Sequence, residues 1–151
     1  MFVGTNQNSI DEKGRLTLSA KWRSELAAGV VITRGLDKCL FIFPKPTYEL
    51  IAHQIDAQGL ALADVRAFAR HLAAMAEMAE PDKQGRIIIP QNLREFAGLN
   101  GDAVVIGVIN RLEVWNPATY KEHNLRIESD ADGVAERYGQ LIQNASLAVA
   151  K

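Results

Sequence analysis

The chain has 151 residues, of which 48% are apolar, and carries 17 Lys and Arg against 18 Asp and Glu, for a net charge of −1. This length suits one domain or two very small ones, and the apolar fraction allows a core without disulfides. Near-neutral charge excludes polyanion binding through bulk charge alone, and the lone Cys39 excludes an internal disulfide and indicates the cytoplasm.

A turn sequence stands near the start of the chain. A strand-like stretch ends at Ser9–Ile10 and is followed by Asp11-Glu-Lys-Gly-Arg15. Asp at the first position and Gly at the fourth are typical of a type I turn, in which Gly is free to adopt positive φ. Because Leu16–Leu18 is β-prone, we expect Asp11–Arg15 to be a hairpin tip. A short helix follows, which Ser19 can cap and which stops near Gly29.

Paired strands and then helices are predicted next. Val30–Thr33 and Leu40–Phe43 form the strand pair, with Cys39 expected to be buried. Residues 46–79 have apolar side chains at helical spacing, and Gly59 is expected to break them into two helices. The apolar stripe at Leu62–Ala76 indicates a core face or a helix–helix seam, with a subunit contact as the alternative.

The second half of the chain repeats the first. A second strand-like stretch ends near Pro81, and Asp82-Lys-Gln-Gly-Arg86 follows it, 71 residues after its counterpart, from position 11 to position 82. The elements expected after it are β-prone Ile87–Ile89, a short helix between Pro90 and Gly98, and strands at 104–109 and 112–115 joined by Asn110–Arg111. A helix from Pro117 towards Glu128, a loop at Asp130–Gly133 and a last helix at Val134–Leu147 complete the chain.

This order predicts an α+β fold built from two tandem repeats. We place repeat 1 at residues 5–51, a helical connector at 52–79, repeat 2 at 80–123 and a C-terminal helical tail at 124–151. Four short strands in each repeat leave many open edges, which must be paired or covered. Interleaving the hairpins of both repeats into one closed barrel would pair those edges.

Positive charge gathers at the repeats. Residues 1–45 carry seven Lys and Arg against four Asp and Glu, whereas residues 46–80 carry two against five. An Arg fork at a hairpin tip can bind phosphate bidentately or read guanine, so Arg15 and Arg86 are the leading DNA-binding candidates. The other candidates are Lys13, Lys21 and Lys83 as added charge, Asp11 and Asp82 as residues that orient the Arg side chains, and Gly14 and Gly85 as turn residues.

A second Arg follows each turn at a fixed distance. Arg23 and Arg94 lie eight residues after Arg15 and Arg86, within the short helices. Two interpretations stay open for them. They are either solvated helical residues or ion-pair partners of neighbouring Glu side chains, or they contact phosphates and position the protein on DNA.

Enzymatic motifs are missing from the sequence. The three His residues are scattered without zinc-ligand spacing, and neither a phosphate-binding Gly-rich loop nor a nucleophile elbow occurs. We therefore expect no catalysis, no metal and no cofactor. The aromatic residues stand among apolar neighbours and are expected in the core: Trp22, Trp115, Phe41, Phe43 and Phe96.

With these motifs the chain resembles the MraZ family. The features that carry the resemblance are the doubled Asp-x-x-Gly-Arg with its second Arg, Met1-Phe2-x-Gly4, and Arg94-x-x-Ala97-Gly98-Leu99, over essentially the whole chain. The resemblance implies two SpoVT-AbrB-type domains whose swapped hairpins form one pseudo-twofold barrel. It also implies a bacterial transcriptional regulator that binds direct repeats upstream of the division and cell-wall genes, lies at the nucleoid and forms ring-like homo-oligomers.

The two repeats depart from one another at two positions. Repeat 1 has Ser19 where repeat 2 has Pro90 and the family usually has Pro in both, and repeat 2 has Gln84 where repeat 1 has Lys13. We therefore expect repeat 1 to contribute more to DNA contact. The overall prediction is a cytoplasmic, nucleoid-associated regulator that binds double-stranded DNA, with repression favoured by the resemblance. The alternative is an oligomeric scaffold whose basic tips bind a protein partner.

Overall fold

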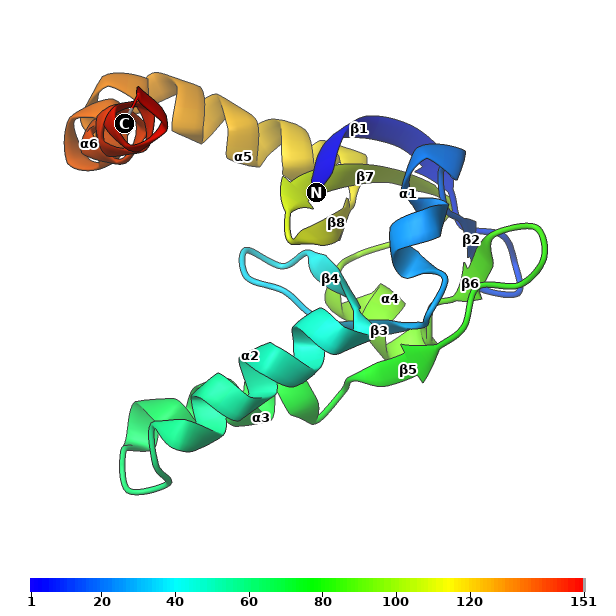
Figure 1. Ribbon diagram of the computed structural model, residues 1–151. Coiled ribbons are helices and arrows are strands. Elements are labelled where there is room, and N and C mark those ends of the chain that lie inside the picture. The colour runs from blue at the N-terminus through cyan, green and yellow to red at the C-terminus, as the bar shows by residue number, and fades with distance from the viewer. Residues whose placement is uncertain (151) are drawn as a thin grey trace. The chain divides into compact units, whose positions relative to one another are not determined.

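The computed structural model describes residues 1–150, which form two compact units, Met1–Pro117 and a second unit that begins at Ala118. Figure 1 labels the elements. The strands are β1 (Phe2–Ser9), β2 (Arg15–Thr17), β3 (Val30–Arg34), β4 (Leu40–Pro44), β5 (Glu77–Ala79), β6 (Arg86–Ile88), β7 (Asp102–Ile109) and β8 (Arg111–Trp115). The helices are α1 (Ala20–Leu26), α2 (Lys45–Ala57), α3 (Ala63–Ala73), α4 (Gln91–Phe96), α5 (Pro117–Ser129) and α6 (Ala131–Ala150).

The first unit is a mixed α+β structure, as predicted. Six antiparallel strands form one sheet in the order β1-β7-β8-β4-β3-β5, and β2 and β6 form a separate two-stranded ribbon. The strands β1 and β5 are the two edges of the sheet, so the described residues form no closed barrel. The expected barrel is therefore not seen.

Strand pairing joins the two halves of the chain. Strand β1 pairs with β7, β3 pairs with β5, and β2 pairs with β6, so each of these contacts links the first half to the second. Neither half could bury its apolar face alone, since the core draws from both. Leu16 and Leu18 of the first half lie in the same buried cluster as Ile87 and Ile89 of the second.

The predicted core residues are buried. Trp22, Trp115 and Phe43 are 2–3% exposed and Phe41 is 8% exposed, while Phe96 packs against the core partly buried. Cys39 is buried at 1% exposure and its Sγ donates a hydrogen bond to the Leu36 carbonyl at 3.0 Å. Burial, aided by nearby carboxylates, raises the pKa of the Cys39 thiol, which matches its predicted role as a small buried residue.

The connector between the halves differs from the prediction at its end. The two expected helices are present as α2 and α3, and Gly59 lies in the turn between them with φ +88°. However, α3 ends at Ala73, and Glu77–Ala79 forms β5, which pairs with β3. The helical region therefore ends before residue 79, whereas the strand expected to end near Pro81 is present as β5.

Two smaller predictions about helix starts are also wrong. Ser19 precedes α1, but its side chain makes no capping hydrogen bond. Residues 131–133, predicted as loop, form the first turn of α6, where the Val134 N–H donates to the Asp130 carbonyl at 3.0 Å. Asp residues favour the N-terminus of a helix through its dipole, and Arg137 pairs with Asp130 at 3.0 Å.

The second unit consists of α5 from Ala118 onward and of α6, and the two helices meet at Asp130. The α6 helix exposes Tyr138, Leu141, Ile142, Leu147 and Val149 at 59–88%. In residues 1–150, no helix combines the length and the apolar character that a membrane crossing requires.

Candidate nucleic-acid interface

The two Asp-x-x-Gly-Arg turns have the same backbone structure. In the first, the Gly14 N–H donates to the Asp11 carbonyl at 2.9 Å and the Asp11 N–H donates to the Arg15 carbonyl at 3.1 Å. In the second, Gly85 and Asp82 repeat both contacts at 2.9 Å. Gly14 and Gly85 have φ of +81° and +76°, a region that L side chains avoid. The sequence therefore needs Gly at the fourth position of each turn.

Each turn Asp holds the Arg that follows it. Asp11 accepts the Arg15 N–H through Oδ1 at 2.9 Å and the Arg15 Nε through Oδ2 at 2.6 Å. Asp82 accepts the same two groups of Arg86 at 2.8 Å each. The side chains of Arg15 and Arg86 stay about one-third exposed, at 33% and 32%. In residues 1–150, their Nη atoms have no hydrogen-bond partner, so each fork is oriented but unsaturated.

The same contacts shift the titration of both carboxyl groups. The Arg15 backbone N–H lowers the pKa of Asp11, against a smaller opposing effect of desolvation, and the Arg15 side chain lowers it further. The Arg86 backbone N–H and then the Arg86 side chain lower the pKa of Asp82. A carboxylate that accepts several N–H groups is stabilised in its charged form. Both Asp side chains are therefore firmly ionised near neutral pH.

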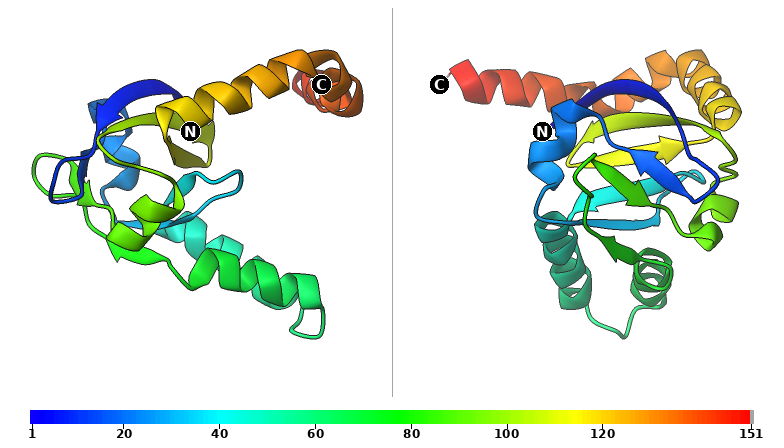
Figure 2. Two further views of the ribbon diagram at one scale, coloured as in Figure 1. Left: turned by 180° about the vertical axis from the view of Figure 1, so that it is seen from behind. Right: turned by 90° about the vertical axis from the view of Figure 1, so that its right-hand side faces the viewer.

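The ribbon of β2 and β6 presents both Arg side chains on its outer face. Arg15 pairs in register with Ile88, and Thr17 pairs with Arg86. Since side chains alternate along a strand, these four residues share one face, while Leu16 and Ile87 between them are 0% and 2% exposed. On the outer face, Arg15 lies opposite Ile88 and Arg86 lies opposite Thr17, so the two Arg residues are related by an approximate twofold axis. The turns stand at opposite ends of this ribbon, as Figure 2 shows on its right.

Acidic groups border one side of this face. Arg15 and Arg86 line one surface hollow of about 390 Å³ together with Glu77, Glu80 and Asp82. The hollow confirms that the two Arg residues, 71 positions apart in the sequence, share one surface. Glu77 and Glu80 would repel a phosphate on the β5 side, which leaves the ribbon and the turns as the more favourable surface for a polyanion.

The predicted Lys residues divide into two groups. Lys13 and Lys83 are exposed within the two turns, beside the Arg residues. Lys21 is exposed on α1, where its Nζ lies 4.6 Å from the centre of the Trp22 ring and beside Gly4 of β1. The structure therefore brings Lys13 and Lys83 to the turns, whereas the recorded contacts of Lys21 are with α1 and β1.

Arg23 and Arg94 do not pair with their neighbouring Glu residues. The Arg23 Nε donates to the Leu18 carbonyl and the Arg94 Nε donates to the Ile89 carbonyl, both at 2.9 Å. Glu25 instead accepts the N-terminal ammonium at 2.8 Å, and Glu95 accepts the Gln91 side chain at 3.0 Å. The ion-pair interpretation of the sequence is therefore wrong for both Arg residues.

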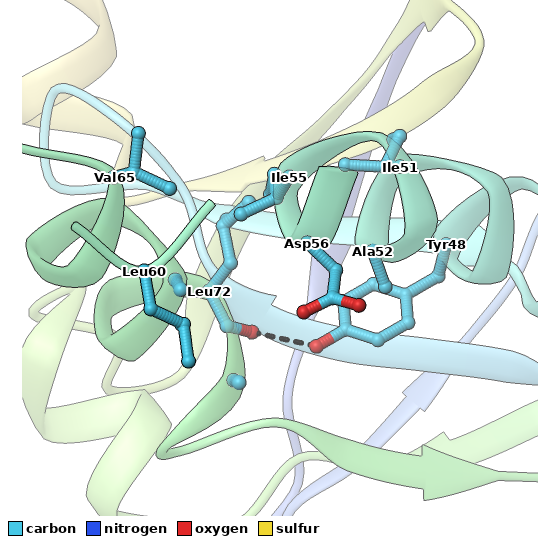
Figure 3. A pocket seen from close by; sticks show the side chains of 10 residues that line it. Tyr48, Ile51, Ala52, Ile55, Asp56, Leu60, Val65 and Leu72 are labelled. Atoms are coloured by element: carbon cyan, nitrogen blue, oxygen red, sulfur yellow. Dashed lines mark hydrogen bonds between the residues drawn. The ribbon is translucent and has the colours of Figure 1, made fainter. Parts of the chain in front are cut away.

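An apolar groove lies between α2 and α3, away from the ribbon. It has a volume of about 200 Å³, and Figure 3 shows Ile51, Ile55, Val65 and Leu72 among its lining residues. The Tyr48 hydroxyl donates to the Leu72 carbonyl at 2.9 Å across it. The predicted apolar stripe of α3 thus forms a helix–helix seam. With Asp56 as its one charged lining residue, the groove has no chemistry suited to a polyanion.

Comparison with known proteins decides the family. A family model described as "MraZ protein, putative antitoxin-like" matches twice, over residues 1–71 and 72–140. The chain belongs to the MraZ family. This double match agrees with the two turns, since one lies in each matched segment. Membership was predicted from the same motifs and is confirmed.

Relatives within the family match over nearly their whole length. "Transcriptional regulator MraZ" of Salinispora arenicola is 44% identical over 136 residues, which are 90% of this chain and 96% of the relative. The proteins of the same name from Syntrophomonas wolfei and Desulforamulus reducens are 40% and 38% identical, over 136 and 142 residues. These alignments cover 90% and 94% of this chain and 95% and 100% of those relatives.

Two residues of the outer face were missed by the sequence analysis. Thr17 and Ile88 lie between the Arg side chains, and Ile88 is 59% exposed. The polar–apolar–polar order of Arg15-Leu16-Thr17 was a signal for one exposed face in β2. In β6 the run Ile87–Ile89 hid that alternation, because an apolar residue also occupies the exposed position.

Proposed function

We propose that the protein is a sequence-specific, DNA-binding transcriptional regulator without catalytic activity, cofactor or metal. The observation that carries this proposal is the pair Arg15 and Arg86 on the outer face of one two-stranded ribbon. A two-stranded ribbon fits the major groove, where an Arg fork reads guanine bidentately. The name of the relatives, transcriptional regulator MraZ, supports the same function.

The proposed roles follow the position of each side chain. Arg15 and Arg86 contact bases or phosphates, and the exposed turn residues Lys13 and Lys83 contact phosphates. Arg23, Arg94 and Lys21 are the more distant basic residues of the proposed site. The orienting residues Asp11 and Asp82, and the turn residues Gly14 and Gly85, maintain the geometry of the two tips.

The DNA target and its consequence are further parts of the proposal. Family membership supports direct repeats upstream of the division and cell-wall gene cluster as the binding site, repression of that cluster and of the protein's own gene, and a location at the nucleoid in the cytoplasm. The strand pairing between the halves supports the swapped-hairpin arrangement of two SpoVT-AbrB-type repeats, with an internal pseudo-twofold axis.

Assembly into a homo-oligomeric ring would reconcile the net charge of −1 with DNA binding. One near-neutral protomer binds weakly, but a ring that presents several ribbons to tandem sites makes the later contacts intramolecular. The exposed apolar side chains of α6 support self-association, since a stripe of this kind on a helix favours contact with another apolar surface. Light scattering coupled to size-exclusion chromatography measures the assembly directly.

The function is tested by DNA binding of single variants. Fluorescence anisotropy with duplexes from the region upstream of the protein's own gene should show affinity falling by about tenfold or more for Arg15→Ala and for Arg86→Ala. Arg70→Ala removes one exposed cation from α3 and is the matched control, with little expected change. If Arg15→Ala binds like the parent protein at equal salt, with the oligomer intact, the proposed interface is wrong.

The scaffold alternative gives a different result in the same assay. DNA affinity should fall linearly with salt on logarithmic axes, with a slope of about one unit for each phosphate contact. A scaffold would bind a protein partner with little dependence on salt and would not retard DNA. Footprinting upstream of the protein's own gene then shows the spacing of the bound repeats.

A further inference from the structure

Arg23 and Arg94 each lie against the turn of the opposite repeat. The Arg23 guanidinium packs so closely on Gly85 that a Cβ there would come 2.7 Å from Arg23 Cζ. Arg94 packs on Gly14 in the same way, with the corresponding Cβ 3.3 Å from Arg94 Cζ. Figure 2 shows on its right that α1 lies near the second turn and α4 near the first.

Backbone hydrogen bonds close a loop of contacts around each of these Arg residues. The Leu18 N–H donates to the Gly85 carbonyl at 2.8 Å, and the Leu18 carbonyl accepts the Arg23 Nε at 2.9 Å. The Arg23 guanidinium then returns to the same Gly85. The second turn is therefore connected to the first repeat by a backbone bond and by a packed guanidinium.

The opposite half of the molecule repeats the loop. The Ile89 N–H donates to the Gly14 carbonyl at 2.8 Å, and the Ile89 carbonyl accepts the Arg94 Nε at 2.9 Å. A Cβ on Gly14 would also come 2.9 Å from the Ile89 carbonyl oxygen. Gly14 is therefore needed for two reasons: the turn requires a positive φ there, and the other repeat approaches too closely to leave room for a Cβ.

We propose that Arg23 and Arg94 are positioning residues that act between repeats: Arg23 fixes the turn that carries Arg86, and Arg94 fixes the turn that carries Arg15. Each planar guanidinium is anchored by Nε and lies over a Gly that immediately precedes a DNA-contacting Arg. Both side chains are half-buried, which fits a side chain packed between two segments. We call this contact of an Arg with the turn of the opposite repeat a brace. The geometry of the second turn then depends on α1, which carries Arg23, and the geometry of the first turn depends on α4, which carries Arg94.

This positioning role differs from the phosphate contact that the sequence also allowed for Arg23 and Arg94, and the two roles predict different effects of an Arg→Lys substitution. Arg23→Lys keeps the positive charge but loses the planar fork and its Nε donor. A phosphate contact would survive most of that change, whereas a brace would not. Arg94→Lys is the symmetric variant. Arg34→Lys is the control, because Arg34 also donates through Nε to a carbonyl, that of His71 at 3.1 Å, at a site outside both turns.

Hydrogen exchange measured by mass spectrometry tests the brace without DNA. In Arg23→Lys, amide hydrogens should exchange roughly several-fold faster in the peptide that covers Asp82–Arg86. Exchange should be unchanged in the peptide that covers Asp11–Arg15. Arg94→Lys should give the reverse pattern, and Arg34→Lys should change neither turn. The proposal is overturned if each variant loosens only the turn of its own repeat, both turns equally, or neither.

A double-mutant cycle tests the consequence for DNA, and this arm rests on the proposed function. Arg23→Lys alone should weaken binding by about tenfold, the scale of one lost charged hydrogen bond. In an Arg86→Ala background it should add less than about twofold, but in an Arg15→Ala background it should keep its full effect, because only coupled residues are non-additive. Equal effects in both backgrounds would overturn the crossed assignment. If no variant affects DNA binding while the exchange pattern holds, the brace stands and the proposed function fails.

Discussion

Arg15 donates through Nε to Oδ2 of Asp11 at 2.6 Å, so the carboxylate next to the proposed DNA contact holds that contact in place. Asp11 also accepts the backbone N–H groups of Lys13 and Arg15, at 3.0 and 2.9 Å. One carboxylate thus fixes both the turn and the direction of the guanidinium. The negative charge of Asp11 lies on the surface proposed to bind DNA. The charge itself should weaken DNA binding, whereas the orientation of Arg15 by Asp11 should strengthen it.

Asp11→Asn should therefore weaken DNA binding, although it removes a negative charge. Simple electrostatics predicts tighter binding, but the amide cannot hold Arg15 as a carboxylate does, and we expect a loss of about tenfold, the scale of a charge-assisted hydrogen bond. Anisotropy at fixed salt measures the change. Glu12→Gln removes the same charge from the neighbouring exposed residue of the turn and should leave affinity unchanged or raise it. Tighter binding by Asp11→Asn would contradict the orienting role.

The turns should resist acid down to the pKa of their Asp residues. Hydrogen bonds from Arg15 and Arg86 lower the pKa of Asp11 and Asp82 from the ordinary 3.8. A lowered folded-state pKa contributes stability that is present above the unfolded value and is lost as pH falls through the folded value. Carboxyl ¹³C NMR titration should give midpoints below 3.8 for both groups. A midpoint at or above 3.8 for either group would contradict its hydrogen-bonded geometry.

The two faces of the ribbon should respond differently to truncation. Leu16 is fully buried, so Leu16→Ala should lower the free energy of unfolding by about 2–5 kcal/mol. Ile88 is 59% exposed on the opposite face, and Ile88→Ala should change it by about 0.5 kcal/mol or less. Urea denaturation of each variant at one protein concentration measures both values. Similar losses for the two variants would mean that the outer face is covered.

The repeat made the local structure of the turns predictable. Asp and Gly at fixed positions specify a hydrogen-bonded turn, and both turns have it. The pairs β3–β4 and β7–β8, whose strands follow one another in the sequence, were predicted and are confirmed. The pairings between the two halves could not be predicted, because alternation of apolar residues gives the buried face of a strand but not a distant neighbour. The pairing of β1 with β7 and of β3 with β5 depends on the packing of both halves together.

Roles that depend on distant contacts were the least predictable. Arg23 was expected to be solvated, to pair with a neighbouring Glu or to contact a phosphate, yet it packs on Gly85 in the other half of the chain. Nothing local in the sequence indicates such a contact, since a long side chain on a helix usually lies in solvent. The recurrence of the same Arg in both repeats was the one available signal.

The inequality of the two repeats is best tested at the exposed turn positions. The backbone bonds of both turns match, so any difference in DNA contact must come from side chains such as Lys13 and its counterpart Gln84. Lys13→Gln should weaken binding to all sequences alike and reduce the salt slope by about one unit, the effect of one lost phosphate contact. Gln84→Lys should raise the slope by a similar amount, because it places an equivalent cation on the second turn. Anisotropy titrations across a range of salt concentrations measure both slopes, and an unchanged slope for Lys13→Gln would exclude a phosphate contact at that position.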